Sequence, residues 1–426
     1  MKRMKILVIG KGGREHALVW KFVQEGHLVF CVPGNPGTDK IATNVAIQAT
    51  DIPKLLKFAQ ENSIDLTVVG PEEPLFLGIV DIFAAHGLRI FGPRSAAARI
   101  EKSKAFARDV MLHTHISQPQ HAIVDDYEKA LAYVRERDCP CFVKADGPAG
   151  GKGAIPCQTL AEAEAALHML MIEKAQGNSG RIVVIEEWLD GDELSAHALC
   201  DGQDALLFPF SRDHKRALDE NKGENTGGMG TVVPASRDDN LYSTAKNQIV
   251  QGILEELRRQ GTPYKGLLYP GLMVTKKGLK VLEFNARFGD PETQVYVRHL
   301  VSPSLGELLV STLDGTLTKQ KPVWRKGFSV CIVLTSGWYP GKDTGEHFSI
   351  EGVEYAEQVP GVVVFHAGTS TKNGRLVTNG GRVLNVTCHA ETLELALKRA
   401  YIAVGRIHFE GKKFRKDIGR SLLASK

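Results

Sequence analysis

A nearly continuous apolar run, followed by a glycine turn and a helix-like segment, opens the chain and constrains its fold most strongly. Residues 5–9 (KILVI) are typical of a buried parallel strand, and residues 17–23 carry apolar side chains at helical spacing. Strand, glycine turn and helix in this order indicate an open α/β domain. The pattern continues to about residue 100, with apolar runs at 28–32, 66–69 and 88–91 and helical segments at 52–62 and 77–86. A further helix is expected at 101–111.

The glycine turn (GKGGREH, residues 10–16) directs backbone N–H groups and a helix N-terminus beyond the strand, which favours an anion. A dinucleotide fingerprint fits less well, because Glu15 stands where its third glycine would be and the second strand ends without an acid. A tight turn without a ligand is the plainer alternative. Two further turns follow strands at the edge where open α/β sheets bind ligands. The candidate residues of these turns are Gly10, Gly12, Gly13, Arg14, Glu15, Asn35, Pro71 and Glu72.

Composition limits the classes to which the chain can belong. A chain of 426 residues needs roughly two to four subdomains, and 43% apolar with 24% charged residues is typical of a folded protein. The small net charge of +4 argues against a dedicated nucleic-acid binder. The seven cysteines lack zinc-ligand spacing, and no apolar stretch is long enough for a membrane span or a signal peptide. We therefore expect reduced thiols and a cytoplasmic protein without nucleic-acid or membrane partners.

Two lysines around a glycine-rich loop give the strongest nucleotide signal. Lys144 lies on a predicted strand that enters a loop of glycines around Lys152. Glycine lets the backbone approach phosphate oxygens, and a lysine on a strand supplies a fixed positive charge. The loop is not a Walker A loop, because neither Ser/Thr nor a helix follows the Gly-Lys pair. A hairpin loop without a ligand is the alternative, but it does not explain a lysine on each side. The loop residues predicted to contact phosphate are Gly151, Lys152 and Gly153.

An acidic strand end follows at residues 181–193. An apolar strand there ends in two acids, an aromatic side chain and an acidic turn. Adenine needs apolar walls with a backbone donor and acceptor, and ribose hydroxyls suit a carboxylate, although such turns are also common without ligands. The nucleotide contacts predicted here are Glu186, Glu187, Trp188, Leu189 and Glu193.

A candidate metal strand lies at residues 281–292 (VLEFNARFGDPE). Because successive strand residues point to opposite faces, Glu283, Asn285 and Arg287 are expected to share one face. A carboxylate beside an amide oxygen suits Mg²⁺, and the arginine can bind a phosphate or carboxylate. A half-exposed edge strand with a surface salt bridge is an equally weighted alternative for this stretch alone. The turn after the strand adds Gly289, Asp290, Pro291 and Glu292 as candidates.

Two further stretches, 211–216 (SRDHKR) and 223–230 (GENTGGMG), are expected near an anionic, amine-bearing substrate. The first mixes acids and bases at high density and supplies Asp213, His214 and Lys215. His214 is either a general base or a structural partner. The second stretch is too rich in glycine for a helix or strand and is expected to form a rigid, ligand-facing loop.

Together these motifs resemble the glycinamide ribonucleotide synthetase family of ATP-grasp enzymes. The similarity runs nearly end to end, and its most specific parts are residues 213–216 (DHKR), 225–230 (NTGGMG) and 283–294 (EFNARFGDPETQ). The resemblance implies a multidomain α/β and α+β fold. It consists of an N-terminal α/β domain (1–103), an ATP-grasp core (104–326) with a small lid (about 123–189), and a C-terminal β-rich domain like that of biotin carboxylases (327–426).

The resemblance also implies an activity: ATP-dependent ligation of glycine to 5-phosphoribosylamine through glycyl phosphate. It assigns ATP to Lys104, Lys144, residues 186–189 and Glu193, and Mg²⁺ or Mn²⁺ to Glu283 and Asn285. Arg287, Lys144 and Asp213 are expected to act on the reacting groups, and the chain is expected to be a monomer. Strands at 327–334, 362–365 and 383–386, a helix at 393–404 and a linker at 321–326 carry no catalytic constellation in the sequence. A ligase or carboxylase with another acid or amine, and a non-catalytic nucleotide-binding protein, are the alternatives.

Overall fold

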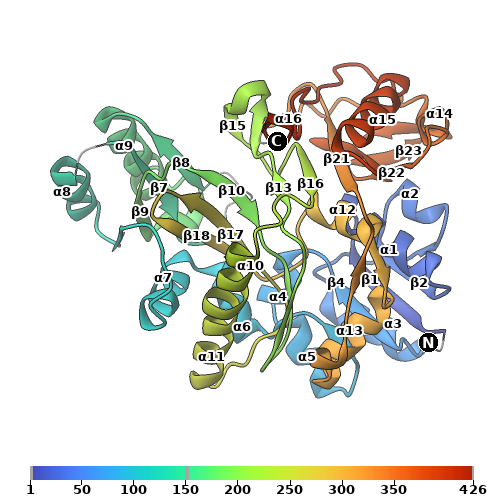
Figure 1. The fold of residues 1–426 in the computed structure, drawn as a ribbon, viewed down its shortest axis with the longest axis horizontal. Coiled ribbons are helices and arrows are strands. Elements are labelled where there is room, and N and C mark those ends of the chain that lie inside the picture. The colour runs from blue at the N-terminus through green and yellow to red at the C-terminus, as the bar shows by residue number, and fades with distance from the viewer. Residues whose placement is uncertain (1–2, 138, 149–152, 425–426) are drawn as a thin grey trace.

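The computed structural model describes residues 3–137, 139–148 and 153–424 (Figure 1). The N-terminal part is a five-stranded sheet of order β3-β2-β1-β4-β5 in which every neighbouring pair is parallel, which confirms the predicted open α/β arrangement. Its strands are β1 (Lys5–Gly10), β2 (Leu28–Pro33), β3 (Thr43–Asn44), β4 (Leu66–Val69) and β5 (Ile90–Phe91), and its helices are α1 (Gly13–Gln24), α2 (Pro36–Asp39), α3 (Ile52–Glu61), α4 (Glu72–Phe76), α5 (Ile79–Ala85) and α6 (Ser95–Lys102).

Two helix predictions in this part were wrong at their boundaries. The helix expected at 77–86 begins at Ile79, because Gly78 takes a left-handed conformation (φ 82°) after α4. The helix expected at 101–111 is broken at Ser103, whose backbone is extended and whose hydroxyl accepts a hydrogen bond from the Phe106 N–H. Ser103 thus caps a new helix, α7 (Lys104–His113), and Lys104 becomes its first residue.

Residues 121–187 form a separate small layer, drawn at the left of Figure 1. It is a sheet of order β6-β9-β7-β8 with its own apolar core against two helices. This layer overlaps the stretch expected to be a lid (about 123–189). Its elements are β6 (His121–Val124), α8 (Tyr127–Arg137), β7 (Cys141–Ala145), β8 (Ala154–Cys157), α9 (Leu160–Leu167) and β9 (Val183–Glu187).

A second, antiparallel sheet faces this layer across the middle of the molecule. Its long hairpin, β17 (Lys265–Thr275) and β18 (Gly278–Asn285), contains a β-bulge, since Gly271 pairs with Glu283 while the next residue, Leu272, pairs with Val281. The predicted alternation is therefore interrupted: Leu282 lines the same cavity as Glu283, and the strand ends before Arg287. The other elements are β10 (Asp192–Ser195), β11 (Ala198–Asp201), β12 (Ala205–Leu207), α10 (Asp239–Thr244) and α11 (Gln251–Arg259).

The C-terminal sheet, of order β13-β16-β21-β25-β22, draws strands from two distant parts of the chain. β13 (Arg212–Asp213) and β16 (Gly230–Val233) precede the predicted linker but join β21 (Phe328–Thr335), β22 (Val362–His366) and β25 (Arg382–Ala390). Residues 223–225 were expected to be loop, but they belong to β15 (Lys222–Asn225), which pairs with β14 (Arg216–Leu218). The remaining elements are α12 (Glu292–His299), β19 (Leu300–Ser302), α13 (Leu305–Asp314), β20 (Val323–Trp324), α14 (Val353–Glu357), β23 (Thr369–Lys372), β24 (Arg375–Thr378), α15 (Leu393–Arg406) and α16 (Arg420–Ala424).

The cysteines and the helices bear on two general expectations from the sequence. The seven cysteines carry thiols, and six of them are buried. Among the described residues, no helix is both long enough and apolar enough to cross a membrane.

Candidate active site

A cavity of about 650 Å³ lies where the N-terminal sheet, the 121–187 layer and the β17–β18 hairpin meet. It collects most of the residues that the sequence predicted, although they come from segments far apart in the chain. The predicted residues that line it are Arg14, Pro71, Glu72, Lys104, Lys144, Gly153, Glu186, Glu187, Trp188, Leu189, Glu193, Asp213, Lys215, Glu283, Asn285, Arg287, Asp290 and Glu292.

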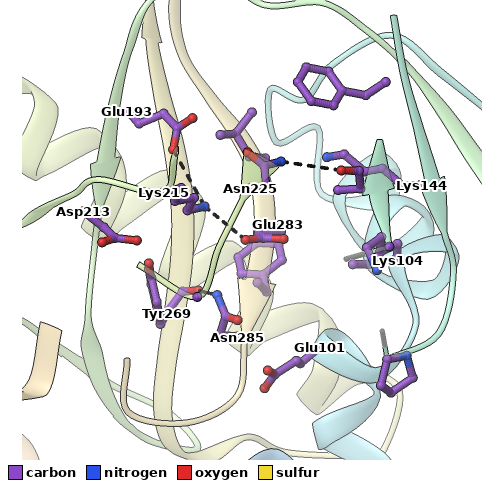
Figure 2. A pocket seen from close by; sticks show the side chains of 18 of the residues that line it. Glu101, Lys104, Lys144, Glu193, Asp213, Lys215, Asn225, Tyr269, Glu283 and Asn285 are labelled. Atoms are coloured by element: carbon purple, nitrogen blue, oxygen red, sulfur yellow. Dashed lines mark hydrogen bonds and ion pairs between the residues drawn. The ribbon is translucent and has the colours of Figure 1, made fainter. Parts of the chain in front are cut away.

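The Glu283 carboxylate is the electrostatic centre of this cavity (Figure 2). Lys215 Nζ lies 3.3 Å from Glu283 Oε1 and 3.7 Å from Glu193 Oε2. The Lys215 ammonium, opposed by burial and aided by Lys144 and Lys104, lowers the pKa of Glu283 to about 2. The Glu283 carboxylate is therefore ionised at neutral pH. Its negative charge interacts with the ammonium groups of Lys215, Lys144 and Lys104.

A divalent cation fits the chemistry of these side chains. Asn285 lies two residues after Glu283 at the end of β18, so a carboxylate and an amide oxygen occupy one strand end. Within residues 3–137, 139–148 and 153–424, no three His, Cys, Asp or Glu side chains are grouped for metal binding. A site with one carboxylate and one amide oxygen suits a hard cation that takes its other ligands from phosphates and water.

Lys144 is held in place by a buried ion-pair network. Glu186 Oε2 lies 2.7 Å from Lys144 Nζ, and Glu186 Oε1 accepts hydrogen bonds from Arg108 Nε (2.9 Å) and its terminal nitrogen (2.5 Å). Burial acts to raise the pKa of Glu186, but Lys144 and Arg108 outweigh it and lower that pKa. The Glu186 carboxylate is thus engaged within the protein, and its role is to orient Lys144.

The part of the cavity beyond Lys144 has an apolar wall. The Trp188 ring stacks on the Phe142 ring, with centroids 4.8 Å apart and an angle of 18° between the planes. Next to it, Glu187 Oε1 accepts hydrogen bonds from Lys280 Nζ (2.5 Å) and from the Gln120 N–H (3.0 Å). The stacked aromatic rings suit the face of a flat ring, and the polar contacts of Glu187 lie beside them.

Arg287 lies at the other end of the cavity between two carboxylates. Its Nε is 3.2 Å from Glu72 Oε2, and one terminal nitrogen is 3.2 Å from Glu101 Oε1. Burial acts to lower the pKa of Arg287, but Glu101 and Glu72 outweigh it and raise that pKa. No sequence pattern singles out Glu101, which also accepts a hydrogen bond from the Ala286 N–H at 2.6 Å.

Asp213 and Glu292 are two acidic side chains whose charges interact, and Glu292 also acts on Arg287. Burial and the neighbouring Glu292 carboxylate raise the pKa of Asp213 well above its ordinary value. Glu292 Oε1 accepts a 2.6 Å hydrogen bond from the Tyr269 hydroxyl and a 3.3 Å bond from the Ser195 hydroxyl. Two carboxylates placed so closely favour a bound cation, such as an ammonium group.

The glycine turn before α1 differs from the predicted anion cradle. Glu15 Oε2 accepts a 2.6 Å hydrogen bond from the Gly12 N–H, so a carboxylate of the chain itself occupies this helix start. Arg14 lines the cavity and contacts Glu15 Oε1 at 2.5 Å, whereas Gly10, Gly12, Gly13 and Glu15 do not line it. Adding a Cβ at Gly10 would place it 2.5 Å from Glu15, which explains the need for glycine there.

Four other predicted residues also lie outside the lining. Asn35 caps α2 and donates hydrogen bonds to the carbonyls of Lys11 and His366. The buried His214 ring contacts the Gly230 carbonyl and accepts a hydrogen bond from the Gly419 N–H, so the structure supports the structural alternative. Gly289 and Pro291 shape the turn before α12 without facing the cavity. Gly151 and Lys152 lie outside the described residues.

Several residues that line or support the cavity were missed by the sequence reasoning. Arg108 follows Lys104 by one helical turn on α7, and that spacing was a signal that could have found it. Tyr269 and Arg382 stand alone in their strands, so no local pattern marks them.

Three family models match consecutive parts of the chain. They are described as the N domain, the ATP-grasp (A) domain and the C domain of phosphoribosylglycinamide synthetase, and they match residues 4–101, 102–293 and 329–421. The chain is 46% identical over 424 residues to a phosphoribosylamine–glycine ligase of Escherichia coli K12, covering 98% of both chains. It is 42% identical over 418 residues to one from Caldanaerobacter subterraneus, covering 97% of this chain and 99% of the relative.

Solved structures agree with this result. The crystal structure of a phosphoribosylamine–glycine ligase from Thermotoga maritima matches with a TM-score of 0.85 and 34% identity, covering 97% of this chain and 99% of that one. A biotin carboxylase from Campylobacter jejuni matches with a TM-score of 0.73 at 15% identity, covering 99% of this chain and 95% of that one. The second match concerns the fold alone, and it confirms the predicted biotin-carboxylase-like architecture.

Proposed function

The chain belongs to the phosphoribosylglycinamide synthetase family, and from that membership we propose that it joins glycine to 5-phosphoribosylamine at the expense of ATP. The products would be glycinamide ribonucleotide, ADP and phosphate, a step of purine biosynthesis. The observation that carries the proposal is the convergence of Lys104, Lys144 and Lys215 around Glu283 in a cavity whose far end holds Arg287. The positive charges of these three lysines and of Arg287 suit a polyphosphate bound next to a carboxylate substrate.

We assign ATP to the end of the cavity that the 121–187 layer covers. Lys144, Lys104 and Gly153 would contact its phosphates. From the sequence alone we propose the same role for Gly151 and Lys152. Trp188 and Leu189 would form the adenine wall, and the Glu193 carboxylate would accept from ribose hydroxyls. Glu283 and Asn285 would hold Mg²⁺ or Mn²⁺, which when bound neutralises charge on the phosphates. That role requires Lys215 to give up part of its contact with Glu283.

The chemistry then has two steps. A glycine carboxylate oxygen attacks the γ-phosphorus of ATP, ADP leaves, and glycyl phosphate forms. The amine of 5-phosphoribosylamine attacks the acyl carbon next, phosphate leaves, and the amine nitrogen loses a proton. Because carboxylates react poorly with amines, phosphorylation supplies the leaving group, while Lys144 and Arg287 stabilise the developing negative charge.

We assign the two acceptor substrates to the opposite end. Arg287 would bind the glycine carboxylate, and Asp213 with Glu292 would bind its ammonium group, in keeping with the raised pKa of Asp213. Arg14, Pro71, Glu72 and Asp290 line the remaining space, where 5-phosphoribosylamine would lie. We further propose that the protein acts as a cytoplasmic monomer.

The test is ADP formation measured as a function of added glycine and phosphoribosylamine, repeated for Glu283→Ala. Turnover should require both substrates in the wild type and fall by about 10²-fold or more in Glu283→Ala, because charge stabilisation at the phosphates is lost. Glu61→Ala, which removes an exposed carboxylate at the end of α3, is the matched control and should retain full activity. Full activity of Glu283→Ala would refute the site, and turnover with another acid or amine would refute the substrate assignment.

A further inference from the structure

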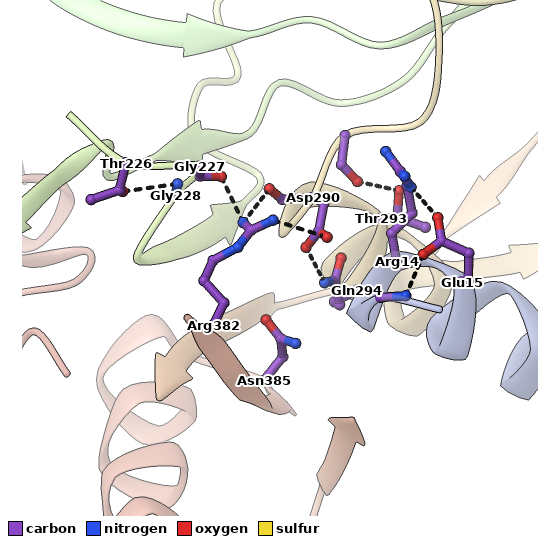
Figure 3. A network of polar contacts seen from close by, with 12 residues as sticks. Arg14, Glu15, Thr226, Gly227, Gly228, Asp290, Thr293, Gln294, Arg382 and Asn385 are labelled. Carbon is purple, nitrogen blue, oxygen red and sulfur yellow. Dashed lines mark hydrogen bonds and ion pairs between the residues drawn. The ribbon is translucent and has the colours of Figure 1, made fainter. Parts of the chain in front are cut away.

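A C-terminal arginine reaches the cavity although the sequence of that region showed no catalytic constellation. Arg382 begins β25, and its side chain lines the same cavity as Asp213, Asp290 and Glu292. Figure 3 shows Arg382 between Gly227 and Asp290. Its side chain is 21% exposed, so most of it is enclosed between other segments. Arg382 therefore links the C-terminal sheet to the acceptor end of the proposed active site, which is the end that we assign to glycine and 5-phosphoribosylamine.

The Arg382 guanidinium joins two separate segments that border the cavity. One terminal nitrogen donates to the Gly227 carbonyl at 2.6 Å and to the Asp290 carbonyl at 2.7 Å. The other terminal nitrogen lies 3.0 Å from Asp290 Oδ2. A planar guanidinium can donate to three oxygens in this way, whereas the single ammonium group of lysine cannot reproduce this geometry.

The loop that carries Gly227 depends on the C-terminal sheet for its position. The Gly227 N–H donates to the Tyr339 hydroxyl at 3.0 Å, so two C-terminal side chains hold both polar groups of this residue. The loop in turn packs against a predicted substrate ligand, since a Cβ on Gly228 would lie 2.7 Å from Asp213 Oδ1. A displaced loop would therefore displace Asp213.

Asp290, the other partner of Arg382, also contacts more than one segment of the chain. Asp290 Oδ1 accepts a 2.7 Å hydrogen bond from Gln294 Nε2, and a Cβ on Gly12 would lie 3.5 Å from Asp290 Oδ2. The start of α1, the turn before α12 and the start of β25 thus meet at this carboxylate. Arg382 is the member of the cluster that also holds the Gly227 loop.

We propose that Arg382 is a positioning residue for the acceptor half of the reaction, fixing the Gly227 loop and Asp290 around the amine substrate. The inference rests on the proposed function, because it assigns the two ends of the cavity as described there. It predicts a division of effects: removing the guanidinium impairs use of the amine and leaves ATP binding intact. Lys104 and Lys144, which we assign to ATP, have Asp146 and Glu186 as partners instead.

The experiment compares Arg382→Gln and Arg382→Lys with the wild type in the steady-state assay, with phosphoribosylamine generated from ribose 5-phosphate and ammonia. Arg382→Gln should lower kcat/KM for the amine by about 10- to 100-fold, as expected when reacting groups lose their alignment. The Kd of a non-hydrolysable ATP analogue should change by less than about 2-fold, and Arg382→Lys should restore only part of the loss. Arg406→Gln removes another C-terminal arginine that donates to a carbonyl, and it should have no effect.

A double-mutant cycle with Asp290→Asn separates this role from a general loss of structure. If Arg382 acts through Asp290, the two residues act as a unit. The double variant should then lose no more kcat/KM for the amine than the single variant with the larger loss. Additive losses, an unchanged kcat/KM for the amine, or an equal loss of ATP-analogue binding would each overturn the inference. If Arg382→Gln does not fold, the same comparison is made with Arg382→Lys. A wild-type protein without glycine-dependent turnover would instead refute the proposed function.

Discussion

The neutral, buried imidazole of His214 should make the folded chain sensitive to acid. Burial, with the nearby Arg415 guanidinium, lowers the pKa of His214 from 6.5 to about 4. Because His214 Nε2 accepts a 3.1 Å hydrogen bond from the Gly419 N–H, the proton of the neutral ring resides on Nδ1, which faces the Gly230 carbonyl. Protonation of Nε2 would place two N–H groups against each other.

The sign and size of the effect follow from this difference in pKa. Below pH 6.5 the unfolded chain binds the proton and the folded chain does not, so stability is complete above that pH and is lost as the pH falls toward 4. One pKa unit corresponds to about 1.4 kcal/mol, so the whole loss is about 3 kcal/mol. About 2 kcal/mol of it should fall between pH 7 and pH 5.

The assay combines histidine NMR with urea unfolding. In protein labelled with ¹³C-histidine, the His214 resonance should remain that of a neutral ring down to about pH 5. The free energy of unfolding should fall between pH 7 and pH 5 by about 2 kcal/mol less in His214→Gln than in the wild type. His86→Gln removes an exposed histidine and should leave the pH dependence unchanged. A His214 resonance that titrates near its ordinary value, or an unchanged pH dependence in His214→Gln, would refute the reasoning.

Three further substitutions probe the framework of the site. Glu186→Ala leaves Arg108 and Lys144 buried without their carboxylate and should destabilise the protein by about 3–5 kcal/mol, seen as a lower midpoint in thermal unfolding; an unchanged midpoint would contradict the buried network. Asn35→Ala removes the cap of α2 and two hydrogen bonds to carbonyls, and urea unfolding should show a loss of about 1–3 kcal/mol; a loss confined to activity would contradict this role. Gly13→Ala places a Cβ 2.2 Å from a buried amide nitrogen and should cost about 1–3 kcal/mol in the same assay; wild-type stability would show that the amide can move aside.

The sequence predicted those parts of the site whose chemistry is carried by a local pattern. Lys144 follows an apolar strand and precedes a glycine-rich loop, and Glu283 and Asn285 stand on alternate positions of another strand. Such patterns depend only on neighbours in the chain, so they survive without knowledge of the fold. The parallel N-terminal sheet was predictable for the same reason, because its strands are continuous apolar runs.

Residues whose role depends on a distant partner were not predictable. Glu101 and Arg108 are single charges on helices, and their importance comes from Arg287 and Glu186, more than seventy positions away. The β-bulge beside Glu283 was equally hidden, since a bulge depends on the register of two paired strands. Glu15 shows a related limit: the pattern marks the glycine turn, but it does not show that the Glu15 carboxylate accepts a hydrogen bond from the Gly12 N–H.

The mixed origin of the C-terminal sheet has a consequence for biosynthesis. β16 pairs with β21, which begins ninety-five residues after β16 ends, so its edge stays unpaired until that stretch has left the ribosome. At roughly 5–20 residues per second, translation leaves this interval open for roughly 5 to 20 seconds. During that time Val232 and Val233, fully enclosed in the finished molecule, are exposed to other nascent chains. Synthesis at high levels should therefore depend on chaperones that shield this segment.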